Sequence, residues 1–394
     1  MGNNREASNL SPLPRWKRTV LVVSLNVLVS SIPVFFVSAL SVQIQNEMDF
    51  GNNLQGTVIA SYFAAAAIAA RFLGQIGDRL HPAFTVRLSL LFTLASCLGI
   101  PLLASSWQTL CLFMVLAGGG NGIVSPALAR VIAQSVPLAR QGLSFGIKQS
   151  SFVVATLFGG VAIPLLALTI GWQFAFFGAA VLAAVLLGLP KDFLIAQSKK
   201  KAHATEDSSQ RPPKSVLRLL AVAFGLGMAA ATALAAFAIA AMVTAGIGIA
   251  SAGIYLALGS AGAICIRLTA GWLIDRGRID HLLLVIILLG LAAVGLLALS
   301  FGGPGTTGVA VIAAYTFTWG WAGLGFYAVV DLHRYRPASA SGIAQSAAAS
   351  GAVLGPIIFG LIATNSSYQV GWIAAAGLTA LAAFFVYRAR SVNS

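Results

Sequence analysis

Long apolar runs are the feature of this sequence that most limits what the chain can fold into. A helix needs about 20 consecutive apolar residues to cross the hydrocarbon core of a bilayer, which is about 30 Å thick. Twelve runs approach or exceed that length. They are residues 19–44, 54–76, 84–104, 109–132, 142–168, 172–188, 216–244, 249–274, 281–299, 307–330, 339–363 and 372–387.

The composition excludes a water-soluble fold. Hydrophobic residues make up 58% of the 394 residues and charged residues 9%, whereas soluble domains carry about 25% charged residues. So few polar side chains cannot coat a globule in water, so the bilayer must be the solvent. We therefore expect an all-α integral membrane protein, which rules out a soluble enzyme, a nucleic-acid binder and a disordered scaffold. The runs predict twelve transmembrane helices.

The basic residues predict the orientation of the chain. The net charge of +14 would fit nucleic acid, but the charges gather before the first run and in every second connection. The opposite connections (45–53, 105–108, 169–171, 245–248, 302–305 and 365–371) contain no Lys or Arg. By the positive-inside rule, both termini are expected in the cytoplasm. Short loops and compact size favour a bacterial plasma (inner) membrane.

The chain divides at its middle. Residues 191–214 hold Lys, Ser, Gln, Asp, Glu and a Pro-Pro pair, the composition of a solvated linker. We expect a six-helix half over residues 1–190, a cytoplasmic linker over 191–214 and a second six-helix half over 215–394.

Short motifs recur in the two halves at nearly one spacing. The sequence GIKQS at 146–150 matches GIAQS at 342–346, a shift of 196 residues. The sequence GQIGDR at 74–79 matches GWLIDR at 271–276, a shift of 197. Duplicated halves around a shared axis are the layout in which substrate sites form between the repeats, near the bilayer midplane.

These motifs and the twelve runs resemble the major facilitator superfamily of secondary transporters over essentially the whole chain. Its loop pattern G-x-L-a-D-R-x-G-R is present in part after Gly74 and more fully from Gly271 to Arg278. In the family this loop is a conformational latch. The resemblance implies that role for Gly74, Asp78, Arg79, Gly271, Asp275, Arg276 and Arg278, with Arg130 as an ion partner for Asp78. The alternative is that these are only cytoplasmic loop charges.

Several chemistries lack their motifs. No G-x-x-x-x-G-K-[ST] pattern for ATP and no H-E-x-x-H pattern for zinc occurs, so we expect no enzyme, no cofactor and no metal. Drug–proton antiporters of the superfamily carry an Arg in the fourth helix, where this chain has Gly118-Gly-Gly.

Three cations lie inside the predicted helices, each roughly 8–11 Å to the cytoplasmic side of the helix centre. Arg71 and Arg267 stand at nearly equivalent places in the two repeats, which favours a structural duty. Lys148 has Ala344 as its counterpart, so the fold does not require it. None of the ten carboxylates lies near the middle of a run, and a substrate anion could supply the missing charge. The alternatives are snorkelling to the interface or a contact with main-chain carbonyls.

Other polar or aromatic residues lie at similar depth. Candidates for binding substrate are Gln149, Asn121, Gln345, Trp319 and Trp321, together with Lys148 and Arg71. Amides can hydrogen-bond a substrate and indoles can cover an apolar part of it. Asn121 could instead satisfy neighbouring backbone, and the tryptophans could only pack.

Two classes of function remain open. The first is a secondary active or facilitative transporter of a small organic solute, expected to be an organic anion, with or without a co-transported proton. Within it, proton-coupled efflux of lipophilic drugs is the alternative. The second is a non-transporting membrane protein. We expect a monomer in the lipid bilayer that binds a small-molecule substrate and no nucleic acid.

Overall fold

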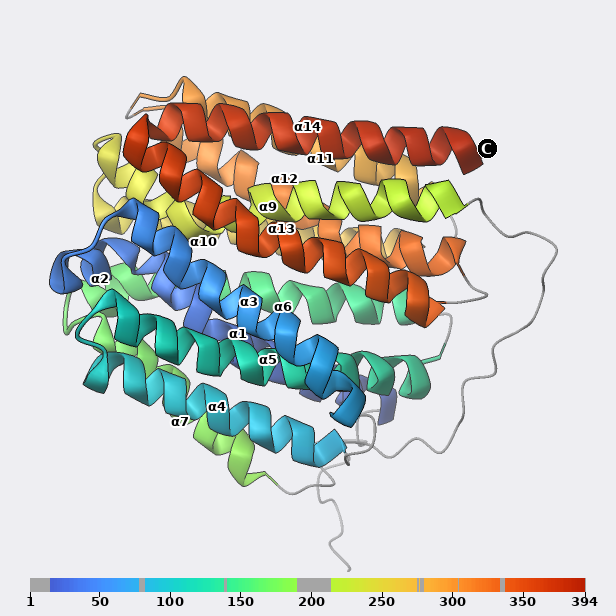
Figure 1. Ribbon diagram of the computed structural model, residues 1–394, viewed down its shortest axis with the longest axis horizontal. Helices are drawn as coiled ribbons and strands as arrows, with labels where there is room; N and C mark the ends of the chain where they lie inside the picture. The colour runs from blue at the N-terminus through green and yellow to red at the C-terminus, as the bar shows by residue number, and fades with distance from the viewer. Residues whose placement is uncertain are drawn as a thin grey trace, which may run out of the picture.

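The computed structural model describes residues 15–77, 82–137, 140–189, 214–274, 276, 280–303, 305–333 and 337–393. These residues form α-helices joined by short connections (Figure 1). The first part of the chain contributes α1 Arg15–Ala39, α2 Ser41–Met48, α3 Asn52–Gly77, α4 Pro82–Leu103, α5 Trp107–Ser135, α6 Gln141–Ala162, the π-helix η2 Ile163–Ala167 and α7 Gln173–Gly188. The second part contributes α9 Lys214–Thr244, α10 Ile249–Ile274, α11 His281–Ser300, α12 Thr307–Leu332, α13 Pro337–Asn365 and α14 Tyr368–Asn393.

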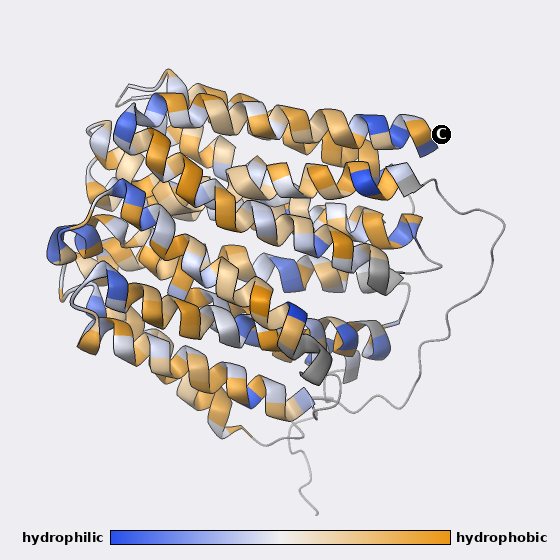
Figure 2. Ribbon diagram, in the orientation of Figure 1, coloured by the Kyte–Doolittle hydropathy of each residue, from blue (hydrophilic) through white to orange (hydrophobic). Residues whose placement is uncertain are grey.

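Eleven of the described helices are long and apolar enough to cross a membrane. The sixth predicted run forms α7, an apolar helix of 16 residues that is shorter than those eleven. Figure 2 shows hydrophilic residues concentrated towards the ends of the helices and apolar residues along their middles. We call the end where α1 begins and α14 ends the terminal end, and the opposite one the α2 end.

Two apolar runs are not single α-helices. Run 19–44 is divided at Leu40 into α1 and α2, and the residues of α2 are mostly polar. Glu47 of α2 accepts a hydrogen bond from the indole N–H of Trp172 at 2.5 Å, which ties α2 to the start of α7. Run 142–168 changes from α-helix to π-helix at Ile163. Pro164 has no N–H to donate to the preceding turn, which favours such a change in hydrogen bonding.

The helices pack in two groups that follow chain order, α1–α7 and α9–α14 (Figure 1). In the first group, α5 packs on α3 and α4, and α1 packs on α6. In the second, α9 packs on α13 and α14, and α12 packs on α10 and α11. The main contacts between the groups are α3 with α13 and α6 with α10. At the interface of α6 and α10, Gly146 of the sequence GIKQS and Gly271 of the sequence GWLIDR both lie against the main chain of the partner helix.

The two contacts between the groups differ along their length. On α6 and α10, glycines meet the partner backbone near both ends, at Gly271 and at Gly160. On α3 and α13, Gly56 meets the main chain of Pro356 near the α2 end. Towards the terminal end Arg71 and Gln345 are exposed. Figure 1 shows α3 and α13 close together at the α2 end and apart at the terminal end.

Candidate functional site

Arg267 of α10 lies at the boundary between the two groups and connects them. Its side chain is 3% exposed. Its Nε donates to the main-chain oxygen of Trp319 in α12 at 2.6 Å. Its Nη1 donates to the main-chain oxygen of Gln149 in α6. One guanidinium therefore holds a helix of the first group against two helices of the second.

A cluster of aromatic rings lies on one side of this guanidinium. Its Cζ lies 5.9 Å from the centroid of the Trp319 ring, within the range of a cation–π contact. Phe35 of α1 meets the same indole edge to face, with 5.6 Å between centroids, and Tyr315 stacks on it at 6.1 Å. The Tyr315 hydroxyl donates to Thr156 of α6 at 3.0 Å. Helices α1, α6, α10 and α12 thus meet around Trp319.

Hydrogen-bond donors exceed acceptors at this place. The indole N–H of Trp319 is buried without an acceptor among the described residues. The guanidinium has donors left over, because only its Nε and Nη1 have protein partners in the described part of the chain. An unpaired buried donor costs about 1–3 kcal/mol. The arrangement is therefore suited to an acceptor, and above all to an anion.

Lys148 and Gln149 are neighbours in sequence but face different helices. Gln149 lies near Gly323 of α12 and shares its face of α6 with Thr156. Lys148 shares its face with Gly159, eleven residues later, and Gly159 meets Phe35 and Phe36 of α1. The two residues therefore line different sides of α6, Gln149 between the groups and Lys148 towards α1.

The ammonium of Lys148 is buried without a counter-charge. The side chain is 8% exposed. Across the described ranges it makes no hydrogen bond or ion pair, and its nitrogen is not among the sealed, unpartnered polar atoms. The nitrogen is therefore not fully enclosed by protein atoms.

Asn121 and Trp321 lie outside the Arg267 cluster. The Asn121 side chain donates to the Ser30 hydroxyl at 2.9 Å and joins α5 to α1 inside the first group. Trp321, two residues beyond Trp319, points into the second group and packs on Phe224 with 5.1 Å between centroids. Trp321 therefore packs, which was its alternative to substrate binding, whereas Asn121 bonds a side-chain hydroxyl and not the neighbouring backbone that was its alternative.

Arg71 is not the structural equivalent of Arg267. Arg71 is exposed, whereas Arg267 is buried. Arg71 precedes the motif glycine by three residues and Arg267 by four, and one residue turns a helix by about 100°. The expected symmetric duty of these two arginines is therefore wrong. Arg71 of α3 and Gln345 of α13 are both exposed near the terminal end of their helices.

The residues predicted to form the latch loops are described only in part. Gly271 is buried, and a Cβ there would lie 3.1 Å from the main-chain oxygen of Gly142. Arg276 is exposed and stacks on Trp272, 3.7 Å from the ring centroid. Gly74 lies in the last turns of α3, and Arg130 lies near the end of α5. Asp78, Arg79, Asp275 and Arg278 lie outside the described residues, as does 190–213, most of the predicted linker; Lys214 already begins α9.

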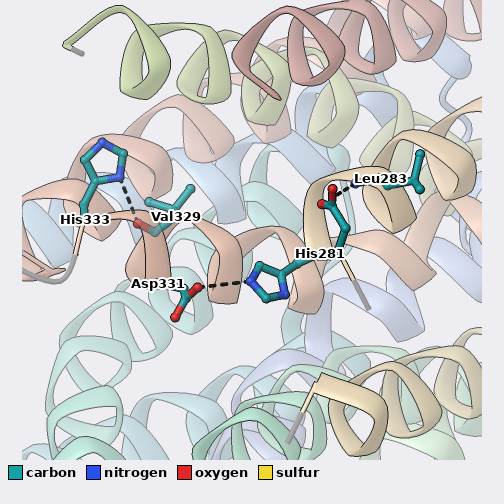
Figure 3. A network of polar contacts seen from close by, with 6 residues as sticks. His281, Leu283, Val329, Asp331 and His333 are labelled. Carbon is teal, nitrogen blue, oxygen red and sulfur yellow. Dashed lines mark hydrogen bonds and ion pairs between the residues drawn. The ribbon is translucent and has the colours of Figure 1, made fainter. Parts of the chain in front are cut away.

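A second polar cluster lies at the terminal end of the second group (Figure 3). His281 of α11 points towards Asp331 of α12 with 3.0 Å between Nε2 and Oδ2. Asp280 accepts from the Leu283 N–H at 3.1 Å and from Arg390 of α14 at 2.8 Å. Beside them is an open cavity of about 470 Å³ lined by Asp280, His281, Leu282, Leu332, Tyr387, Arg390, Ser391 and Asn393.

Two groups in this second cluster have shifted pKa values. Partial burial raises the pKa of Asp280, but the Leu283 N–H and the Arg390 cation outweigh it, so the pKa is lowered overall. Burial lowers the pKa of His333, and its hydrogen bond with the Val329 carbonyl opposes this only in part. The described residues contain no group of three or more His, Cys, Asp or Glu that could hold a metal ion.

Sequence reasoning missed most of the Arg267 cluster. Arg267 was recognised as an intramembrane cation but was expected to have a structural duty, and Phe35, Thr156 and Tyr315 were not singled out. Hydropathy does not show which residues of distant helices meet. A buried cation with no carboxylate at its depth was the signal that could have found this site.

Comparisons with known proteins agree with the helical architecture. The sequence model of the Major Facilitator Superfamily matches residues 19–351. An uncharacterised transporter of the MFS type from Mycobacterium tuberculosis is 32% identical over 121 residues, which are 30% of this chain and 21% of that relative. The chain thus matches about a fifth of the relative's length.

The fold is also similar to a solved structure. That protein is a bacterial homologue of the human lysosomal transporter Spinster, in an inward-facing and occupied conformation. The TM-score is 0.70 with 16% identity, over 97% of this chain and 98% of the other.

Proposed function

Because this chain belongs to the major facilitator superfamily of membrane transporters, we propose that it carries a small organic anion across the membrane by alternating access. In this mechanism the two groups of helices rock against each other around a site near the bilayer midplane. The observation that carries the proposal is a pair of buried cations, Arg267 and Lys148, without a carboxylate at their depth.

The charge balance supports an anionic substrate. The guanidinium and the ammonium are 3% and 8% exposed, and burying a charge without a partner is costly. The carboxylates in the described part of the chain, Glu47, Asp49, Asp280 and Asp331, lie at the ends of helices or just outside them. A substrate carboxylate or phosphate bound at either cation would neutralise its charge.

The membrane arrangement is part of the same proposal. We place α7 as the twelfth transmembrane helix beside the eleven longer ones, with six helices in each half. The terminal end would face the cytoplasm, and the protein would act as a monomer in the plasma membrane. Substrate would enter from that side between α3 and α13, past Arg71 and Gln345. The motif loops after α3 and α10 would act as latches.

A ligand screen of the purified protein in detergent tests the substrate class. Organic anions, neutral metabolites and lipophilic cations are compared by thermal shift on the wild type and on Lys148→Ala. A ligand at about 100 times its Kd stabilises a protein by roughly 2.7 kcal/mol. We expect stabilisation by anions that is lost in Lys148→Ala, and proteoliposome uptake of the same anions.

A control variant and a second group of ligands distinguish anion transport from drug efflux. Arg218→Gln, which changes an exposed arginine of α9, should respond as the wild type does. Stabilisation by lipophilic cations alone, equal in Lys148→Ala, would overturn the anion proposal in favour of lipophilic-drug efflux. A proton gradient imposed across the proteoliposomes then decides whether transport is coupled.

A further inference from the structure

We propose that Arg267 is a clamp between the two groups of helices and that the substrate's carboxylate releases it. In the resting arrangement the guanidinium bonds the main chains of Gln149 and Trp319. A bound carboxylate takes the place of the Gln149 oxygen and frees α6 from α10. This inference rests on the proposed anion transport and adds the binding residue and the step that links binding to movement.

The partners of Arg267 are the first argument. Both are neutral main-chain carbonyls, one in each group of helices. A guanidinium binds a carboxylate more strongly than it binds a neutral oxygen, through two parallel charge-assisted hydrogen bonds. An arriving carboxylate therefore competes effectively for this site. The bond to Gln149 is the one that crosses between the groups.

The surroundings of the guanidinium are the second argument. Its Nη2 has no partner in the part of the chain that the structure describes, and it is not among the sealed, unpartnered polar atoms. A small acceptor can therefore reach it without first breaking a bond. The Trp319 indole N–H, which is sealed without an acceptor in this arrangement, becomes a second donor once the helices shift.

The packing of α6 on α10 is the third argument. Gly146 of α6 lies against the main chain of Arg267, with 3.0 Å between its would-be Cβ and the oxygen. The guanidinium thus bridges the groups where their backbones are already close. Any separation of the groups at this level must break the bond to Gln149. A ligand that replaces this bond lowers the cost of the movement.

The aromatic side chains next to Arg267 indicate the kind of anion. Phe35 and Tyr315 each contact Trp319, which lies beside the guanidinium. A carboxylate that carries an apolar or aromatic group would place its charge on Arg267 and its ring or chain against Trp319.

Binding measurements with acid–amide pairs test the role of the guanidinium. The probes are benzoate, phenylacetate and succinate, each compared with its neutral amide, on the wild type, Arg267→Gln, Arg267→Lys and Arg218→Gln. We expect Arg267→Gln to bind the acids roughly 10- to 100-fold more weakly, with the amides unchanged. Arg267→Lys should recover only part of the loss, because an ammonium lacks the planar fork. Arg218→Gln should match the wild type.

Spin labels test the clamp separately. Ile68 of α3 and Ile343 of α13, which are 60% and 46% exposed, are changed to Cys after Cys111 and Cys265 are replaced by Ala. We expect benzoate or another binding acid to shift the distance distribution between the labels. Arg267→Gln should shift it without ligand. If Arg267→Gln without ligand gives the same distance distribution as the parent protein, the proposed clamp is overturned.

The outcomes distinguish the two proposals. Acids that bind the wild type and Arg267→Gln equally overturn the role of Arg267 and leave anion transport standing. A wild type that binds none of the acids overturns both. If Arg267→Gln does not fold, Arg267→Lys carries the decision. The inference is overturned if Arg267→Lys binds the acids as tightly as the wild type does and also gives the same distance between the labels as the parent protein.

Discussion

Gly160 of α6 and Gly253 of α10 face each other across the two groups of helices at the closest range their backbones allow. A Cβ on Gly160 would lie 2.6 Å from the main-chain oxygen of Gly253, and a Cβ on Gly253 would lie 2.5 Å from that of Gly160. In lipid, close backbone approach of this kind replaces the hydrophobic effect as a source of helix association.

A methyl group at this contact should destabilise the protein. Gly253→Ala places its Cβ against backbone that cannot turn aside, so we expect a loss of about 1–3 kcal/mol and a lower Tm. The matched control is Gly290→Ala in α11, where a Cβ meets nothing within 4 Å. That variant should be neutral or more stable by up to about 1 kcal/mol. Equal melting temperatures for the two variants in detergent would contradict the contact.

The hydrogen bond between Tyr315 and Thr156 should couple the two groups energetically. Removing either hydroxyl, by Tyr315→Phe or Thr156→Val, breaks the same bond. A double-mutant cycle should therefore give a coupling of about 0.6–1.7 kcal/mol. Tyr62→Phe is the control, because Tyr62 donates to the Ser30 carbonyl within the first group. Its cycle with Thr156→Val should be additive, and equal coupling in both cycles would refute the assignment.

Asp280 should make stability depend on acidic pH. Because its pKa is lowered in the folded state, its contribution is complete above its ordinary pKa of about 3.9 and is lost as the pH falls through the lowered value. Asp280→Ala should cost about 1 kcal/mol at pH 7 through loss of the cap on α11. This deficit should narrow below pH 4.

Arg390→Gln separates the ion pair of Asp280 from its cap. The pair is exposed, so its loss should cost at most about 1 kcal/mol. Melting curves at pH 7, 5 and 3.5 give the comparison. A deficit of Asp280→Ala that stays constant over this range would be inconsistent with the lowered pKa.

Titration of His333 should change the stability of the protein at a higher pH than titration of Asp280 does. Its lowered pKa means that the folded protein favours the neutral ring. Protonation is then easier in the unfolded state, so stability is full above about pH 6.5 and falls as the pH drops through that value. We expect His333→Gln to lose less stability than the wild type between pH 7 and 5.5. The control is His203→Gln, in the polar segment 191–214, whose stability should change with pH as that of the wild type does. The His281–Asp331 pair is present in all three proteins, so it does not contribute to the difference between them.

The sequence was enough to predict a membrane protein and its family, because both predictions depend on hydropathy and short motifs, which are local properties of the chain. The run 216–244 is apolar apart from Arg218, Thr232 and Thr244, and α9 spans Lys214–Thr244 accordingly. The recurring loop motifs and the twelve runs indicated the family, and the family match confirms it. The prediction of one helix over run 19–44 is wrong, because hydropathy does not show the division at Leu40 that separates α2 from α1.

The site was less readable than the fold. Trp319 and Gln149 were both candidates, and the structure joins them through Arg267. Trp321 was an equal candidate by depth, yet it turns into the core of its own group. A difference of two residues on one helix decides between these places, and no sequence pattern here shows which face meets the other group.

The sequence by itself determined the solvent of this protein, the position of its apolar segments and the recurrence of its motifs, because hydropathy and motif spacing act along the chain. The tertiary structure alone decided which cation became the link between the halves. A one-residue difference before the motif glycine turns Arg267 inward and Arg71 outward, because each residue rotates a helix by about 100°. Burial, partners and charge balance all follow from that rotation and from the helices that pack against it.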